Sequence, residues 1–229
     1  MKPIAIYSLP RTYSTVILSA SLRPNKMNEP LAEWNMYGTD MPTILNAFTL
    51  YPLYAVTRYG EYWENLQVQL NAPTTSLKTF GRHIRNFWPA REWWSNLQRN
   101  DTHDTFVLYR DLREIITSHL VSTQFGFNKH LETELRYTTL DRNHIKWVVD
   151  ELDAFITYFP ENATLISLET LPASHFDLKQ NPLNVEKQNS LDKVKYIKNM
   201  DWVNENIDAI IKFFEPGWNA KLRSCKQGG

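Results

Sequence analysis

The chain has little cysteine and no excess of charge of either sign. Cys225 is its only cysteine, so no internal disulfide can form and no cysteine-based metal site can be built. Lysine and arginine together number 25, and so do aspartate and glutamate, so no overall field attracts nucleic acid or an anionic membrane. These absences predict a protein of a reducing, cytoplasmic setting that binds neither nucleic acid nor a membrane.

Long apolar runs are also missing. No stretch of 18 or more apolar residues occurs, and the first residues lead into a strand without the basic region and apolar run of a signal peptide. We therefore expect neither secretion nor a membrane span. With 229 residues, 42% of them hydrophobic, the chain can bury one sizeable core, and a single domain over residues 1–229 is expected.

Residues 4–18 combine a short apolar strand, a polar turn and the start of a helix. A strand that hands over to a helix presents unpaired N–H groups and the positive end of the helix dipole to an anion. Arg11 adds a full positive charge, while Ser14 and Thr15 add hydroxyl donors. The pattern predicts a phosphate-binding turn, although a plain helix cap after a strand would look similar. An ordinary ATP or GTP loop does not fit, because the turn has no glycine and the Gly-Lys-Ser/Thr pattern is missing.

A second strand, basic turn and helix occupy residues 106–118. Arg110 stands where the strand ends, and Ser118 lies eight residues, or two helical turns, further on. Both side chains can therefore close on one phosphate. Taken without the first pattern, the charged residues within 110–114 would indicate only a solvent-exposed helix start with local ion pairs.

In this order, the two patterns resemble two sequence motifs of the sulfotransferase family. The first family motif is Pro-Arg/Lys-Ser-Gly-Ser/Thr-Thr, with Thr12-Tyr13 here in place of Ser-Gly. The resemblance implies that the 5′-phosphosulfate end of 3′-phosphoadenosine 5′-phosphosulfate (PAPS) is bound by Arg11, Thr12, Tyr13, Ser14 and Thr15.

The second family motif is Arg-Asp-Pro-Arg-x-x-x-x-Ser, with Leu112 here in place of the proline. Its first arginine and final serine bind the 3′-phosphate, which assigns that role to Arg110 and Ser118. The implied enzyme transfers a sulfuryl group from PAPS to a hydroxyl or amine of a small-molecule or glycan acceptor and releases PAP. Soluble members of the family modify small molecules or intracellular acceptors.

Sulfuryl transfer requires a base for the acceptor proton and positive charge at the leaving phosphate oxygen. Arg11 is a candidate for that charge, and Lys78 resembles the strand lysine of a family Lys-Thr-His motif, so no metal is needed. Phe80 replaces the histidine of that motif. Glu33 is the candidate base, because its surroundings resemble the Glu-Pro-x-Glu-aromatic setting of another family branch.

Two other residues are alternatives for the base. Glu29 is one, although it could instead cap a helix or pair with the arginines. His83 is the other, because an unperturbed histidine pKa suits proton transfer near neutrality, although an ordinary surface histidine is the competing interpretation. Two other functions also stay open: a catalytically idle member of the fold that only binds its ligand, and an atypical P-loop kinase that requires Mg²⁺ and ATP.

Apolar spacing and turn residues predict alternating strands and helices. Strands are expected over residues 3–8, 75–80, 105–109 and 164–168, and Gly81, Arg82 and His83 are expected to form a turn. Helices are expected over residues 14–21, 42–62, 89–100, 112–124, 140–159 and 203–214. Residues 177–189 are expected to form a long loop and residues 226–229 a frayed tail. The fold is therefore expected to be α/β, a P-loop-like three-layer arrangement with a mainly parallel sheet between helices, and its ligands beyond the carboxyl ends of the strands.

Overall fold

The computed structural model describes residues 1–10, 12, 14–21, 23–32, 63–86, 88–125, 138–167 and 194–227. The helix expected over residues 42–62 and the loop expected over residues 177–189 lie outside these ranges. In the described part of the chain, six strands form one sheet in the order β2-β3-β1-β4-β5-β6. The strands are β1 (Ile4–Ser8), β2 (Asn25–Asn28), β3 (Thr75–Thr79), β4 (Asp104–Tyr109), β5 (Thr164–Ser167) and β6 (Lys226–Gln227). All of their pairings are parallel, which confirms the expected α/β class.

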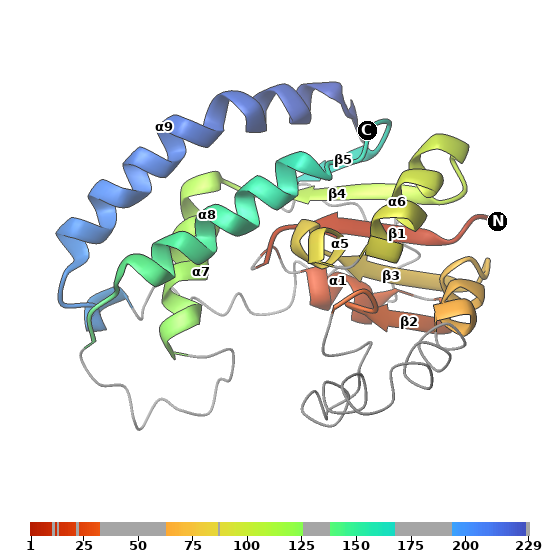
Figure 1. The fold of residues 1–229 in the computed structure, drawn as a ribbon, viewed down its shortest axis with the longest axis horizontal. Helices are drawn as coiled ribbons and strands as arrows, with labels where there is room; N and C mark the ends of the chain where they lie inside the picture. Colours follow the sequence, from red (N-terminus) through yellow and green to blue (C-terminus); the bar gives the residue numbers. More distant parts are fainter. Residues whose placement is uncertain are drawn as a thin grey trace.

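Helices alternate with these strands along the chain (Figure 1). They are α1 (Ser14–Ala20), α5 (Gly81–Asn86), α6 (Trp88–Asn100), α7 (Leu112–Phe125), α8 (Arg142–Thr157) and α9 (Met200–Ser224), and residues 63–70 are also helical. The expected helices at 14–21, 89–100, 112–124 and 140–159 are confirmed to within two residues at each end. The last helix is longer than expected, because it continues through Pro216 to Ser224.

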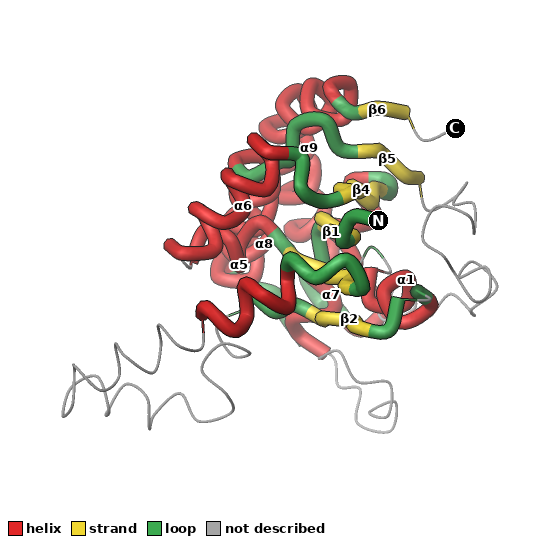
Figure 2. The backbone as a smooth tube through the Cα atoms, turned by 90° about the vertical axis from the view of Figure 1, so that its right-hand side faces the viewer, coloured by secondary structure: helices red, strands yellow, loops and turns green. Residues whose placement is uncertain are grey.

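Helices cover both faces of the sheet, with α1 on one side and α5, α6 and α8 on the other (Figure 2). Ile4 and Ile6 pack with Ile17 and Leu18 of α1 in a small core on one face. Their neighbours Ala5 and Tyr7 face the larger core, to which α5, α6, α7, α8 and α9 contribute. A parallel sheet buried on both faces needs strands that are apolar throughout, and β1 is buried at every position.

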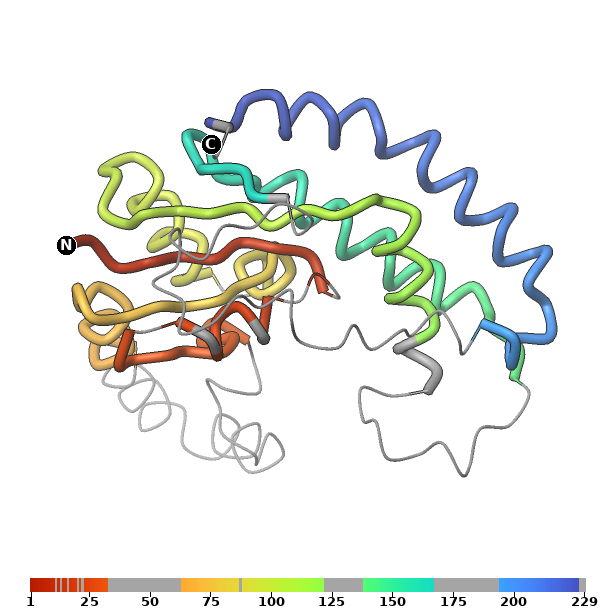
Figure 3. Tube along the Cα trace, turned by 180° about the vertical axis from the view of Figure 1, so that it is seen from behind, coloured from red at the N-terminus to blue at the C-terminus, as the bar shows by residue number. Residues whose placement is uncertain are grey.

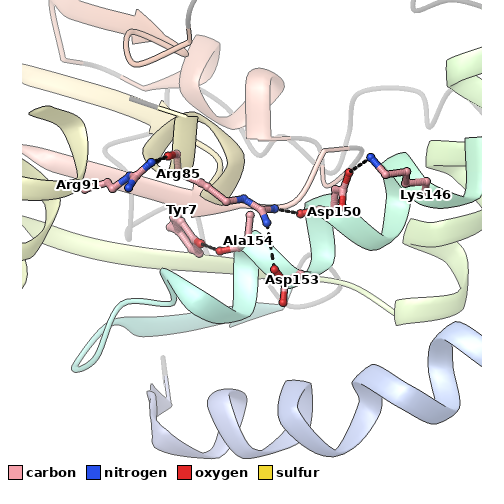
Figure 4. Close-up of polar contacts among 7 residues, drawn as sticks. All are labelled: Tyr7, Arg85, Arg91, Lys146, Asp150, Asp153 and Ala154. Carbon is pink, nitrogen blue, oxygen red and sulfur yellow. Dashed lines mark hydrogen bonds and ion pairs between the residues drawn. The ribbon is translucent and has the colours of Figure 1, made fainter. Parts of the chain in front are cut away.

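Helix α5 is packed closely against α8. A Cβ atom on Gly81 of α5 would lie 2.4 Å from Ala154 O of α8. Tyr7 Oη of β1 donates to Phe155 O of the same helix at 2.9 Å. Figure 4 shows Arg85 reaching across from α5 to the Asp150 carbonyl and to the Asp153 carboxylate, the latter at 3.0 Å. The turn expected at Gly81-Arg82-His83 is therefore wrong: these residues begin α5, whose first residue must lack a side chain.

Two short strands contradict or extend the expectations from sequence. Residues 226–229 were expected to fray, but Lys226 and Gln227 form β6, in register with Thr164 and Leu165 of β5. Strand β2 was not expected, and it pairs with β3 so that Asn28 stands opposite Lys78. None of the described helices combines the length and the apolar character that a membrane span requires.

Candidate functional site

The site is located by the order of the strands. β1 lies between β3 and β4, so the carboxyl ends of these three strands lie at one edge of the sheet (Figure 3). From β1 the chain passes through α1 to β2 on one side, and from β3 it passes through α5 and α6 to β4 on the other. Such a reversal of direction leaves a crevice beyond the strand ends, where open α/β sheets bind ligands.

Residues 9–15, the first turn, follow β1 at this edge. Thr12 and Ser14 are buried, and Thr12 Oγ1 donates to Leu9 O at 2.8 Å. A hydroxyl has one proton to donate, and Thr12 uses it for the Leu9 carbonyl. The Thr12 side chain therefore holds the turn together. Arg11 and Tyr13, the other two expected ligand residues of this turn, lie outside the described residues.

Lys78 brings a buried ammonium group to the first turn. Its side chain rises from β3, is 1% exposed as a residue, and its Nζ donates to Thr15 Oγ1 at 2.7 Å. Nζ also forms an ion pair with Glu29 Oε1 at 2.6 Å and lies 4.8 Å from the centre of the Phe80 ring. Burial lowers the pKa of Lys78, and the Glu29 carboxylate opposes that shift. The contact between Lys78 and Thr15 unites two residues that the sequence proposed separately.

Glu29 is held at this place by its backbone. It follows β2 with a φ of 55°, a left-handed conformation that is uncommon outside glycine. Its N–H donates to Lys78 O at 3.0 Å, and its carbonyl accepts from Ala32 N at 3.0 Å. Its carboxylate is 17% exposed, with Oε2 3.9 Å from His83 Nε2. Glu29 thus pairs with Lys78, a partner that was not considered from sequence.

His83 is buried on α5 behind this ion pair. Burial, followed by the charges of Arg82 and Lys78, lowers the pKa of His83 to about 3. The ring is therefore neutral at pH 7 and holds a proton only weakly. Both interpretations from sequence, a surface histidine and a base titrating near neutrality, disagree with this environment.

This environment predicts that His83 makes stability depend on pH. The unfolded state takes up the histidine proton near pH 6.5 and the folded state only near pH 3, so His83 stabilises the fold fully above pH 6.5. Between pH 6.5 and 3 we expect the free energy of unfolding to fall by at most about 1.4 kcal/mol per pH unit through this residue.

Urea unfolding of the native chain and of His83→Gln at pH 7.5, 6.5 and 5.5 measures this contribution. The variant should lose less stability on acidification than the native chain. Equal pH slopes for the two proteins would contradict the buried, neutral ring. His103, whose pKa is also lowered by burial, is present in both and cancels in the comparison.

A second ion pair joins α5 to α8 next to His83. Arg82 Nε lies 3.0 Å from Glu151 Oε1, and the Arg82 guanidinium lies 5.3 Å from the Trp147 ring centre. Burial raises the pKa of Glu151, and Arg82 opposes that rise. None of these three residues was proposed from sequence as a residue of the site. Glu151 carried a signal, because it falls on the apolar stripe of its helix with Val148, Leu152 and Phe155.

Residues 110–118, the second turn, follow β4 and lead into α7. Asp111 Oδ1 accepts from Glu114 N at 2.9 Å and so caps the helix. Arg110, whose side chain is 18% exposed, forms an ion pair with Glu114 one turn ahead. Ser118 is buried two turns into α7. The local ion pair that the sequence allowed is present, and a partly exposed pair of this kind is weak enough for a phosphate to replace it.

Of the residues proposed from sequence, the structure describes Thr12, Ser14, Thr15, Glu29, Lys78, His83, Arg110 and Ser118. Glu29 follows β2, and the others belong to β3, α5 or the two turns at the carboxyl ends of β1 and β4. Glu33, the candidate base, lies outside the described residues. Among the residues described, no group of three or more histidine, cysteine, aspartate or glutamate side chains could hold a metal ion. No family model, curated protein or solved structure matches the chain.

Proposed function

We propose that the protein is a PAPS-dependent sulfotransferase. The observation that carries the proposal is the shared position of two strand–turn–helix units, which follow neighbouring parallel strands β1 and β4, with the Lys78 ammonium against Thr15 of the first unit. A nucleotide with phosphate groups at both its 3′ and 5′ positions needs two such anion sites at one edge of the sheet.

In this proposal the two turns bind opposite ends of PAPS. Arg110 and Ser118 bind the 3′-phosphate, and the phosphate displaces Glu114 from the Arg110 guanidinium. Ser14, Thr15 and Lys78, with Arg11 and Tyr13, bind the 5′-phosphosulfate. The residues fit that group because a buried ammonium already lies at the start of α1, where negative charge is also favoured by the helix dipole.

The reaction forms one bond to sulfur and breaks another. The acceptor oxygen or nitrogen attacks sulfur in line, the bond from sulfur to the 5′-phosphate oxygen breaks, and PAP leaves with the electron pair. Lys78 and Arg11 stabilise the charge that grows on this oxygen. The products are the sulfated acceptor and PAP, and the acceptor proton passes to a base.

A carboxylate is the base in this proposal. Glu33 keeps the role assigned from its sequence setting. Of the two alternatives, Glu29 fits better than His83, because its carboxylate lies beside Lys78 whereas the His83 pKa of about 3 makes that ring a weak proton acceptor.

A second candidate is an idle member of the fold that binds PAP without turning over PAPS. It is favoured by one contact: Glu29 Oε1 lies 2.6 Å from Lys78 Nζ and competes with the leaving phosphate for that charge. It is distinguished from the enzyme by turnover alone, since both bind PAP.

Calorimetry with PAP and with AMP tests the proposal. We expect PAP to bind at least about 100-fold more tightly than AMP, because a 3′-phosphate adds charge-assisted hydrogen bonds worth roughly 1.5–3 kcal/mol each. Equal affinities, or no binding of PAP, would count decisively against it. Incubation with PAPS and chromatography of released PAP then separates the enzyme from the idle candidate.

A further inference from the structure

A groove of about 660 Å³ runs along β2, the strand at the end of the sheet. One wall is β2 with the prolines that flank it, and the other is a face of the helical stretch 63–70. Among the described residues of its lining, four carry a carboxamide: Asn25 and Asn28 on β2, and Asn65 and Gln69 on the helical stretch. We call this the carboxamide groove.

The carboxamide groove has the chemistry of a carbohydrate site. Its four carboxamides belong to exposed residues, and Asn65 and Gln69 share one helix face because they are four residues apart. A carboxamide carries both a donor and an acceptor, as does every sugar hydroxyl. Met27, which is half-buried, adds apolar surface for the C–H groups of a sugar ring. Among the lining residues that the structure describes there is no carboxylate, and the ammonium of Lys26 donates to Ser19 O at 2.7 Å.

One end of the carboxamide groove lies next to the ion pair of Glu29 and Lys78. Asn28 and Pro30 line the groove, and Glu29 between them directs its carboxylate to Lys78. In the pairing of β2 with β3, Asn28 stands opposite Lys78 itself. The four residues of β2 span roughly 13 Å, room for more than one sugar ring along the strand.

We propose that the carboxamide groove binds a glycan and presents one of its hydroxyl groups beside Glu29 and Lys78. The role of this hydroxyl as acceptor rests on the proposed function, because the hydroxyl would accept the sulfuryl group of the PAPS bound at Lys78. An extended peptide, added as a strand to the edge of β2, would use backbone hydrogen bonds and alternate side-chain pockets instead. The carboxamides on the opposite helix wall favour the glycan.

Saturation-transfer NMR tests the groove with maltohexaose, cellohexaose and chitohexaose, three uncharged linear oligosaccharides. We expect at least one to bind, and the double variant Asn65→Ala/Gln69→Ala to weaken it by at least about tenfold, since each lost hydrogen bond is worth roughly 1 kcal/mol. Gln67→Ala is the matched control, because Gln67 lies on the same helical stretch and outside the lining. Alanine at exposed helix positions preserves the fold.

An acetylated Ser-Tyr-Ser-Tyr-Ser peptide is measured in parallel. The proposal is overturned if none of the three sugars binds, if the double variant binds as the native chain does, or if the peptide alone binds. PAP calorimetry on the same preparations separates the two proposals. Binding of PAP without sugar refutes only the glycan site, and binding of sugar without PAP refutes only the sulfotransferase.

Discussion

Replacing Arg110 by alanine is expected to weaken PAP binding by about 10- to 100-fold while AMP binding stays unchanged, because only PAP carries the phosphate that this guanidinium binds. The proposed site gives Arg110 no ligand other than the 3′-phosphate, and in the structure its guanidinium forms an ion pair with Glu114 of α7. The ratio of PAP affinity to AMP affinity, measured by calorimetry, should therefore collapse toward one.

Arg113→Ala is the matched control for this variant. Arg113 lies three residues after Arg110, in the first turn of α7, but its side chain is half exposed and pairs with Asp208 of α9. The proposal requires PAP affinity to survive the loss of Arg113 and to fall with Arg110. Equal losses in the two variants would show a general effect of positive charge near α7, and the assigned 3′-phosphate site would then be wrong.

Much of the fold follows from short-range patterns. β1, β3 and β4 are short runs, buried or half-buried over most of their length, and each is followed within six residues by the start of a helix. β2 carries no such signal, since the strand Asn-Lys-Met-Asn is polar and mostly exposed. It forms because β3 offers a free pairing edge and because Asn25 Nδ2 donates at 3.0 Å to Thr74 Oγ1, of the residue just before β3. Tertiary pairing decides such strands, and intrinsic propensity does not.

In the candidate site, too, some residues could be predicted from local sequence patterns and others depend on tertiary structure. Phosphate-binding turns have a local pattern of strand end, basic residue and hydroxyl, so Thr15 and Arg110 could be named from sequence. Glu29 could be named only as one of several acids, because its position depends on a positive φ and on hydrogen bonds with Lys78 and Ala32. The depressed pKa of His83 depends on burial by surrounding elements, which no local pattern records.

Replacing Lys78 by methionine is expected to lower the rate of PAP release from PAPS by about 10²- to 10³-fold, the usual cost of losing one donor to the charge of a transition state. Methionine fills the space of the buried lysine stem and removes only the ammonium. The measurement is the initial rate of PAP formation, followed by chromatography, with p-nitrophenol as the acceptor.

The substitution also removes the positive charge 2.6 Å from the Glu29 carboxylate, and a poorly folded variant would be inactive for that reason alone. The double variant Lys78→Met/Glu29→Gln removes both charges and should regain most of the stability in urea unfolding, but not the rate. Lys146→Met, at an exposed lysine of α8 paired with Asp150, should keep both. If Lys78→Met folds and releases PAP at the native rate, the ammonium against Thr15 takes no part in the chemistry. The buried lysine would then only join β3 to α1 and to the turn after β2.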